Sequence, residues 1–429
     1  MFSRIQTRHF RSLKAVDQTL GPIQALVRPN ASGKTTFLDV IGLLSDLVHV
    51  HPRGTVRETM LSRSASFDKL IWQGPGEDAG SRAAFQLAVE APIPAAVRAR
   101  MADDKQRYTL VRYELEIGLD APTEELGLNH ETLWLRTTDA ETPAQQRDLF
   151  PLVPDHAPSI LVGKGRPGFK VVMKKTPGGN DNYYTEGAKK SYAPSFRLGR
   201  SKLALAHIPA DEDNFPVSSW FRDLLESCVQ NVVLNSQVIR QPSPPGLGQR
   251  FQTNGSNLPW VIAELRRDRQ RFGDWLEHVR TALEDIIDID TVERREDRHR
   301  YLVIKYANGA EIPSWLASDG TLRLLALTIP AYLSDLNGVF LIEEPENGIH
   351  PRAIETVIQS LSSIYDGQVL IATHSPVALN MLEPAQILCF AKDKAGATDI
   401  VAGDCHPALQ NWKQGHPDLG SLFAAGILS

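Results

Sequence analysis

The feature that most constrains the fold is the regular alternation of apolar runs and helical patterns towards the end of the chain. The pattern predicts a helix at 320–333, a strand at 339–344, a helix at 351–364, a strand at 368–374 and, after another helix, a strand at 385–391. The strand segments read VFLIEE, QVLIATH and AQILCFA, and such near-continuous apolar runs are typical of strands buried on both faces. This alternation predicts an α/β fold in which helices cover both sides of a sheet.

The stretch LVRPNASGKTTFLDVI, residues 26–41, contains most of a phosphate-binding loop. A strand is expected at 24–27 before the loop and a helix at 35–48 after it, which is the context that such a loop requires. Backbone N–H groups and the positive end of the helix would then bind phosphate. The loop residues expected to contact the nucleotide are Asn30, Ala31, Ser32, Gly33, Lys34, Thr35 and Thr36. Arg28 replaces the usual first glycine, so weakened affinity is expected; taken alone, the stretch could also be an ordinary strand–helix connection.

Polar residues follow two of the buried strands. Strand 339–344 ends in Glu343 and Glu344, whose side chains should point to different sides, so that one can reach a metal-bound water and the other can polarise an attacking water. His374 ends strand 368–374 and could meet a γ-phosphate. Solvated acids and a structural histidine are the alternative interpretation.

A fourth stretch, WLASDGTLRLLAL, contains Ser318, Asp319 and Gly320 directly before an apolar helical pattern. Locally these residues predict a helix N-cap. The same helix N-terminus could also receive a phosphate group.

In this order, RPNASGKTT, LASDGTLRLLAL, FLIEEPENGIHP and IATHSP resemble the motifs of ABC-type ATPases. The chain is similar to the branch of chromosome-maintenance (SMC), double-strand-break repair and overcoming-lysogenization-defect (OLD) proteins, and most of all to prokaryotic AAA-family ATPases, which often belong to antiphage defence systems. The resemblance implies an ABC-type P-loop NTPase head, a mixed or parallel sheet with flanking helices and an inserted helical/β lobe. It also implies that the protein binds ATP and Mg²⁺.

The resemblance assigns roles to individual residues of this chain. Lys34 and Thr35 would be the Walker A lysine and the Mg²⁺-binding hydroxyl. Glu343 would be the Walker B acid that supports Mg²⁺, Glu344 the general base, and His374 the switch histidine.

The remaining assignments concern the contact between two copies of the chain. Ser318, Asp319 and Gly320 would form the signature motif, which meets the γ-phosphate bound by a second copy, and residues 347–350 would form the D-loop. A homodimer, or a higher assembly of such dimers, is therefore expected. Arg11, in FRS, resembles an arginine that meets the nucleotide in related ATPases, and Gln73 is a candidate for the glutamine loop.

Helical periodicity over 215–290, between strand-like and Gly/Pro-rich segments, suggests four parts of the chain. These are 1–210, an N-terminal part of the ATPase head with a β-rich subdomain; 211–300, a helical insert lobe; 301–400, the C-terminal part of the head; and 401–429, a tail.

Bulk properties restrict the setting. The net charge of −5 gives no global signal for nucleic acid, although DNA binding through a local patch stays possible. The three cysteines are far apart, which argues against a disulfide framework or a zinc site. Because the N-terminal stretch does not resemble a signal peptide and no apolar run reaches about 18 residues, a cytoplasmic protein outside the membrane is expected.

Three functions compete at this point. The first is the sensor or regulatory ATPase of an antiphage system, which controls a separate effector nuclease or toxin. The second is a repair or chromosome ATPase on DNA, which the lack of sustained heptads over 50–310 disfavours. The third is a nucleotide-gated scaffold with negligible turnover. Only 55 residues follow His374 and they lack an acid cluster, so any nuclease is expected to come from a partner.

Overall fold

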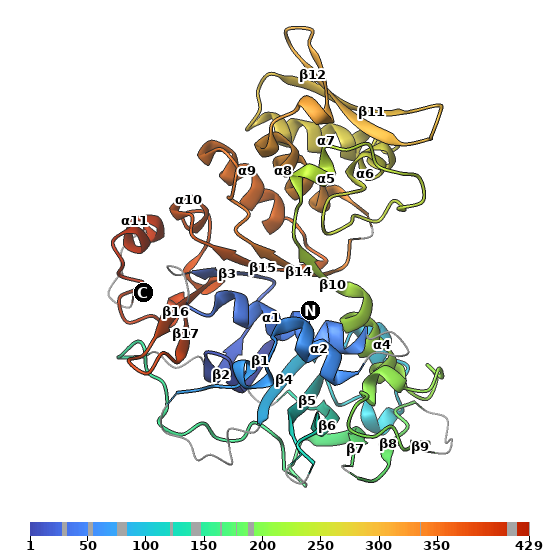
Figure 1. Ribbon diagram of the computed structural model, residues 1–429, viewed down its shortest axis with the longest axis vertical. Helices are drawn as coiled ribbons and strands as arrows, with labels where there is room; N and C mark the ends of the chain where they lie inside the picture. Colours follow the sequence, from blue (N-terminus) through green and yellow to red (C-terminus); the bar gives the residue numbers. More distant parts are fainter. Residues whose placement is uncertain are drawn as a thin grey trace.

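The computed structural model describes residues 1–27, 32–49, 55–74, 84–120, 123–138, 147–163, 165–176, 178–187, 193–334, 336–409 and 418–428. Arg28, Asn30 and Ala31 of the predicted phosphate loop lie outside the described residues. An antiparallel sheet, a mainly parallel sheet and a helical lobe with a small sheet of its own follow one another along the long axis (Figure 1).

A six-stranded sheet with the order β10-β14-β15-β3-β16-β17 lies in the middle. Its strands are β3 (Ile23–Val27), β10 (Val229–Val232), β14 (Gly338–Glu343), β15 (Gly367–Thr373), β16 (Ile387–Lys392) and β17 (Thr398–Ala402). All neighbours pair in parallel except β16 and β17. Every residue of β3 and β15 is buried, as their apolar sequences predict. The carboxyl ends of β3, β14 and β15 meet at one edge, where ligands bind in open α/β sheets.

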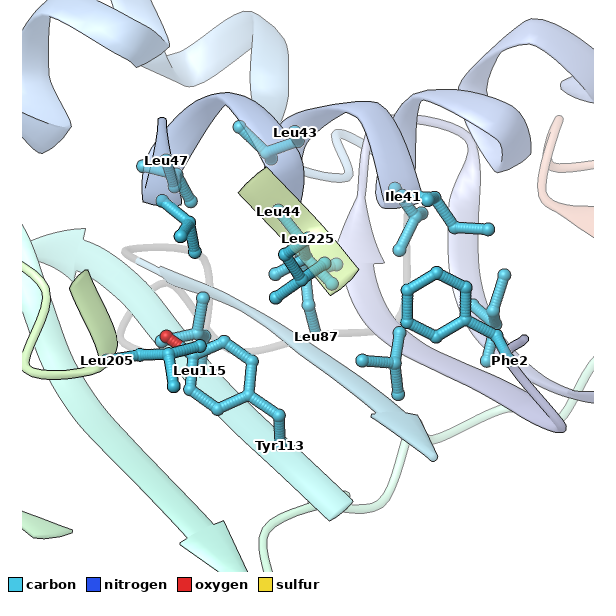
Figure 2. Packing of buried hydrophobic residues seen from close by; sticks show 14 of the residues in the cluster. Phe2, Ile41, Leu43, Leu44, Leu47, Leu87, Tyr113, Leu115, Leu205 and Leu225 are labelled. Atoms are coloured by element: carbon cyan, nitrogen blue, oxygen red, sulfur yellow. The ribbon is translucent and has the colours of Figure 1, made fainter. Parts of the chain in front are cut away.

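Helix α1 (Lys34–Val48) covers one face of this sheet and packs on a second, antiparallel sheet. Leu43, Leu44 and Leu47 of the helix share a core with Leu87 and Leu115 of that sheet (Figure 2). The second sheet has the order β2-β1-β4-β5-β6-β7-β8-β9. Its strands are β1 (Arg4–Phe10), β2 (Leu13–Thr19), β4 (Ala84–Pro92), β5 (Leu110–Leu119), β6 (Leu126–Arg136), β7 (Phe169–Lys175), β8 (Asp181–Tyr183) and β9 (Ser195–Phe196). Around it lie α2 (Val56–Arg63), α3 (Ala95–Arg98) and α4 (Pro216–Asp223).

The opposite face of the central sheet is covered by a second core. Its helices are α8 (Asp319–Thr328), α9 (Pro351–Ser362), α10 (Pro376–Leu379) and α11 (Leu419–Ala424). The lobe above them contains α5 (Ser236–Ile239), α6 (Leu258–Leu265), α7 (Arg269–Arg280), β11 (Ile286–Glu293), β12 (Arg300–Tyr306) and β13 (Glu311–Pro313). The indole of Trp275 in α7 donates to Thr328 Oγ1 in α8 over 3.0 Å, which ties the lobe to the head.

The α/β prediction with a covered parallel sheet is confirmed, and the expected helix at 35–48 and strand at 24–27 agree with α1 and β3 to within a residue. The range 215–290, predicted to be helical, was partly wrong. It also contains β10, which pairs with β14 in the central sheet, and the start of β11. The segment 211–300 therefore contains strands as well as helices, and its strand β10 belongs to the central sheet. Strand β10 has only four residues, which are too few to show an alternating apolar pattern in the sequence.

The helix predicted at 320–333 also ends early. It stops at Thr328, and a 3₁₀ turn (Ile329–Tyr332) follows because Pro330 cannot donate the next helical hydrogen bond. Among the helices of the described residues, none has the length and apolar character needed to cross a membrane.

Candidate functional site

A cavity of about 320 Å³ opens where β3, β14 and β15 end and α1 begins. Most of the residues that the sequence selected line it. The lining residues are Arg11, Ser12, Ser32, Gly33, Lys34, Thr35, Thr36, Glu343, Glu344, Ala372, His374 and Lys392. The fold thus brings the start of the chain together with three segments that lie more than 300 positions later.

Two contacts join the predicted phosphate loop to the strands beside it. Lys34 Nζ lies 3.0 Å from His374 Nε2, and Thr35 Oγ1 donates to Glu343 Oε2 over 2.6 Å. Lys34 is buried, with 7% of its surface exposed. A buried ammonium and a hydroxyl–carboxylate pair therefore lie at the N-terminus of one helix, and such groups suit a phosphate and a hard divalent cation, respectively.

The backbone at the N-terminus of α1 is open to close approach by a ligand. Within the described part of the chain no side chain caps α1, and Gly33 adopts a left-handed backbone with φ of +100°. A Cβ on Gly33 would lie 2.6 Å from Thr398 Oγ1 and 2.8 Å from Ser12 Oγ. Thr398 Oγ1 donates towards the carbonyl oxygen of Ser32 at 2.9 Å, which fastens the loop to β17. Only glycine satisfies both the space and the backbone angle here. The first residues of α1, whose N–H groups no described side chain caps, line the cavity.

Glu344 and Arg11 share an unusual backbone conformation. Both have positive φ angles, +48° and +49°, which non-glycine residues rarely adopt, and both line the same cavity. Strain of this kind persists where the surroundings impose it and is concentrated at functional sites. The backbone N–H of Glu344 donates to the carbonyl oxygen of Ala372, which holds this residue at the end of β15, and Arg11 Nη1 lies 3.1 Å from Asp39 Oδ2.

The ring of His374 lies between groups of opposite charge. Burial and the charge of Lys34 lower the pKa of His374, while the carboxylates of Glu344 and Glu346 oppose this shift. The ring is therefore neutral at neutral pH. Because the ammonium of Lys34 can only donate, His374 Nε2 accepts, and the ring proton resides on Nδ1. Glu344 Oε1 lies 3.9 Å from the same Nε2, and half of the Glu344 side chain is exposed to solvent.

The second predicted half-site lies elsewhere. Ser318 caps α8, because its hydroxyl accepts from the N–H of Thr321 at 3.1 Å. Gly320 packs under a neighbouring loop, where an added Cβ would lie 2.8 Å from the carbonyl oxygen of Gly348. Helix α8 belongs to the core on the opposite face of the central sheet from α1 (Figure 1). None of the residues 318–320 lines the cavity of Lys34.

Asp319 brings a negative charge to the same helix end. Arg240, at the end of α5, contacts it through Nε and Nη2 at 3.0 and 2.5 Å. The arginine compensates the carboxylate at a place where an anion would otherwise be repelled.

Parts of the sequence are similar to known proteins. Residues 192–380 match the family described as AAA domain, putative AbiEii toxin, Type IV TA system. A stretch of 44 residues, 10% of this chain, is 48% identical to the OLD nuclease of Thermus scotoductus and covers 8% of that protein. A stretch of 115 residues, 24% of this chain, is 30% identical to the retron Vc95 probable ATPase of Vibrio cholerae and covers 22% of it. The chain therefore aligns with less than a quarter of the length of these relatives.

Among solved structures, an SMC head bound to the C-winged helix domain of ScpA superposes with a TM-score of 0.52 over 93% of this chain and 96% of that one, at 12% identity. This likeness concerns the fold. The family match and the two relatives, each over part of the chain, support an SMC- and OLD-like ATPase family for this protein.

Sequence reasoning missed four residues of the candidate site. Ser12 and Lys392 line the cavity, Thr398 anchors the loop, and Glu346 contacts the strand end that carries His374. The positions of Lys392 and Thr398 follow from the pairing of β16 with β3 and of β17 with β16. For Glu346, the sequence EPE after β14 was a local signal. Gln73 does not line the cavity; its amide donates to the carbonyl oxygen of Asp68 at 2.7 Å.

Proposed function

We propose that this protein is an ATP-binding and ATP-hydrolysing switch whose complete site forms between two copies of the chain. The observation that carries the proposal is the pair of contacts between the start of α1 and the ends of two distant strands, Lys34 to His374 and Thr35 to Glu343. These contacts assemble a cation, a metal-binding oxygen pair and a neutral imidazole around one helix N-terminus, which are the groups that phosphoryl transfer to water requires.

Each side chain has a separate task in this proposal. Lys34 and the N–H groups at the start of α1 bind the phosphates. Thr35 and Glu343 would hold Mg²⁺, which when bound neutralises phosphate charge. Glu344 accepts the proton of the attacking water, because its carboxylate is half exposed and near the neutral ring of His374. His374 stays neutral and would donate its ring N–H to an oxygen of the γ-phosphate.

The proposed dimer rests on the separation of the two half-sites. Since α1 and α8 lie on opposite faces of the central sheet, Ser318 cannot reach the Lys34 cavity of its own chain without unfolding the head. A head-to-tail arrangement of two copies would place the N-terminus of α8 of one against the cavity of the other. Closing and opening of that dimer would then follow binding and hydrolysis.

For the biological role, we propose a regulatory ATPase of a prokaryotic antiphage system that controls a separate effector nuclease or toxin. The partial similarity to an OLD nuclease, to a probable retron ATPase and to a putative toxin domain of a toxin–antitoxin system supports this role.

Mixing two inactive variants tests the shared site. Ser318→Arg blocks the signature end, and Lys34→Ala removes the phosphate lysine. In a mixed dimer the intact loop of the first faces the intact signature of the second. A one-to-one mixture should regain roughly a quarter of wild-type turnover, because half of the randomly paired dimers are mixed and each has one of two sites intact.

Gln359→Arg is the matched control, because it adds the same bulk and charge at an exposed position in α9, outside the signature residues, and should keep wild-type turnover. A mixture that stays inactive while mixed dimers are demonstrated by differential tagging would refute the shared site.

A further inference from the structure

The side chain of Glu346, in the loop after β14, contacts the end of the neighbouring strand β15. One of its oxygens, Oε1, accepts a hydrogen bond from Thr373 Oγ1 at 2.9 Å and another from the backbone N–H of His374 at 2.7 Å. Its other oxygen, Oε2, is buried and has no hydrogen-bond partner among the described residues. The carboxylate therefore satisfies the backbone donor of the very residue whose ring meets Lys34.

The loop that carries Glu346 is a compact turn. The N–H of Asn347 donates to the carbonyl oxygen of Glu344 at 2.9 Å, and the N–H of Ile349 donates to that of Glu346 at 3.0 Å. The carbonyl oxygen of Gly348, the residue before Ile349, lies against Gly320 at the start of α8. The turn therefore touches the signature end of α8 on one side and the end of β15 on the other.

We propose that Glu346 is a positioning residue that holds the backbone of His374 in place and thereby couples the signature end of α8 to the hydrolytic site of the same chain. The proposal rests on the proposed ATPase function. A movement of the turn at Gly348, such as a second copy would cause by docking on α8, would reach His374 through two hydrogen bonds and no intervening flexible segment.

A carboxylate is suited to this task. A charged acceptor makes shorter and stronger hydrogen bonds than a neutral one, and both bonds here are at or below 2.9 Å. Without the acceptor, the N–H of His374 and the buried hydroxyl of Thr373 would each lose a partner, and the strand end could shift relative to Lys34. The ring of His374 would then lose its alignment, while the phosphate loop at α1 would be unaffected.

The test compares Glu346→Ala with Glu346→Gln. The glutamine oxygen can still accept both hydrogen bonds, whereas alanine removes the acceptor. We expect Glu346→Ala to lower kcat about tenfold or more, with the Kd for ATP changed by less than about twofold, and Glu346→Gln to retain at least about a third of wild-type kcat. Glu355→Ala, which removes an exposed carboxylate from the neighbouring helix α9, is the control and should match wild type.

Three results would overturn the proposal. They are equal kcat for Glu346→Ala and wild type, equal loss in the alanine and glutamine variants, and a Kd for ATP that rises as much as kcat falls. Thermal melting of each variant shows whether the head is folded. If Glu346→Ala does not fold, Thr373→Val removes one of the two donors at the same oxygen and should lower kcat in the folded protein; wild-type turnover would refute the coupling. Absence of hydrolysis by the wild-type protein is a different result, because it would refute the ATPase proposal itself.

Discussion

Replacing Glu344 by glutamine should separate binding from hydrolysis. The amide keeps the size and the left-handed backbone of Glu344, and its backbone N–H can still donate to the carbonyl oxygen of Ala372. Unlike the carboxylate, an amide cannot accept the proton of an attacking water. The substitution therefore removes one chemical capacity while leaving the loop after β14 in place.

The contacts of Glu344 set the expected magnitudes. Its carboxylate lies 3.9 Å from the ring of His374, which is neutral, while Lys34 contacts His374 and Thr35 contacts Glu343. The phosphate-binding groups thus keep their own partners, and ATP affinity should be equal or slightly higher because a negative charge has left the cavity. Loss of a general base costs about 10²- to 10⁴-fold in kcat.

The assay measures phosphate release at saturating ATP, together with the Kd of a fluorescent ATP analogue. Glu343→Gln is the matched control, because Glu343 accepts the hydroxyl of Thr35 and would lie beside Mg²⁺. That variant should lose Mg²⁺-dependent binding as well as turnover. Wild-type kcat for Glu344→Gln would remove Glu344 from the role of base, and a parallel rise in Kd would show that the residue binds nucleotide instead.

Two further changes test the two ends of the site. Gly320→Ala places a Cβ 2.8 Å from the backbone oxygen of Gly348 and should lower the free energy of unfolding by about 1–3 kcal/mol, measured by urea denaturation. In Gly273→Ala in α7, the new Cβ has nothing within 4 Å, so the free energy of unfolding should rise by about 0.5–1 kcal/mol. The reverse order of these two variants would contradict the packing of the loop on α8. Lys392→Ala should weaken ATP binding about three- to tenfold in low salt, because this ammonium lines the cavity, while Lys394→Ala, two residues further along and exposed, should bind as wild type does. Equal affinity of both lysine variants would place Lys392 outside the nucleotide site.

The local chemistry of the site was readable from the sequence. Strand, glycine loop and helix around Lys34 are specified by neighbours in the chain, because helix start, glycine flexibility and apolar periodicity are short-range properties. The buried strands that end at Glu343 and directly before His374 were predicted for the same reason, as strands covered on both faces need continuous apolar residues. The order of the motifs also led to the resemblance to SMC- and OLD-like ATPases that the comparisons support.

What only the tertiary structure decided is which of these ends meet. The order β14-β15-β3-β16 places His374 beside Lys34 and brings Lys392 and Thr398 to the same loop, and no local pattern encodes the order of strands in a sheet. β10 was misjudged for a related reason, since four residues pair with β14 through long-range hydrogen bonds rather than through any propensity of their own. The contact of Glu346 with His374, and the position of Ser318 on the far face, likewise depend on how the sheet is covered. Sequence specifies each element through its neighbours in the chain, whereas the site arises from the packing of those elements, in which side chains hundreds of positions apart share one cavity.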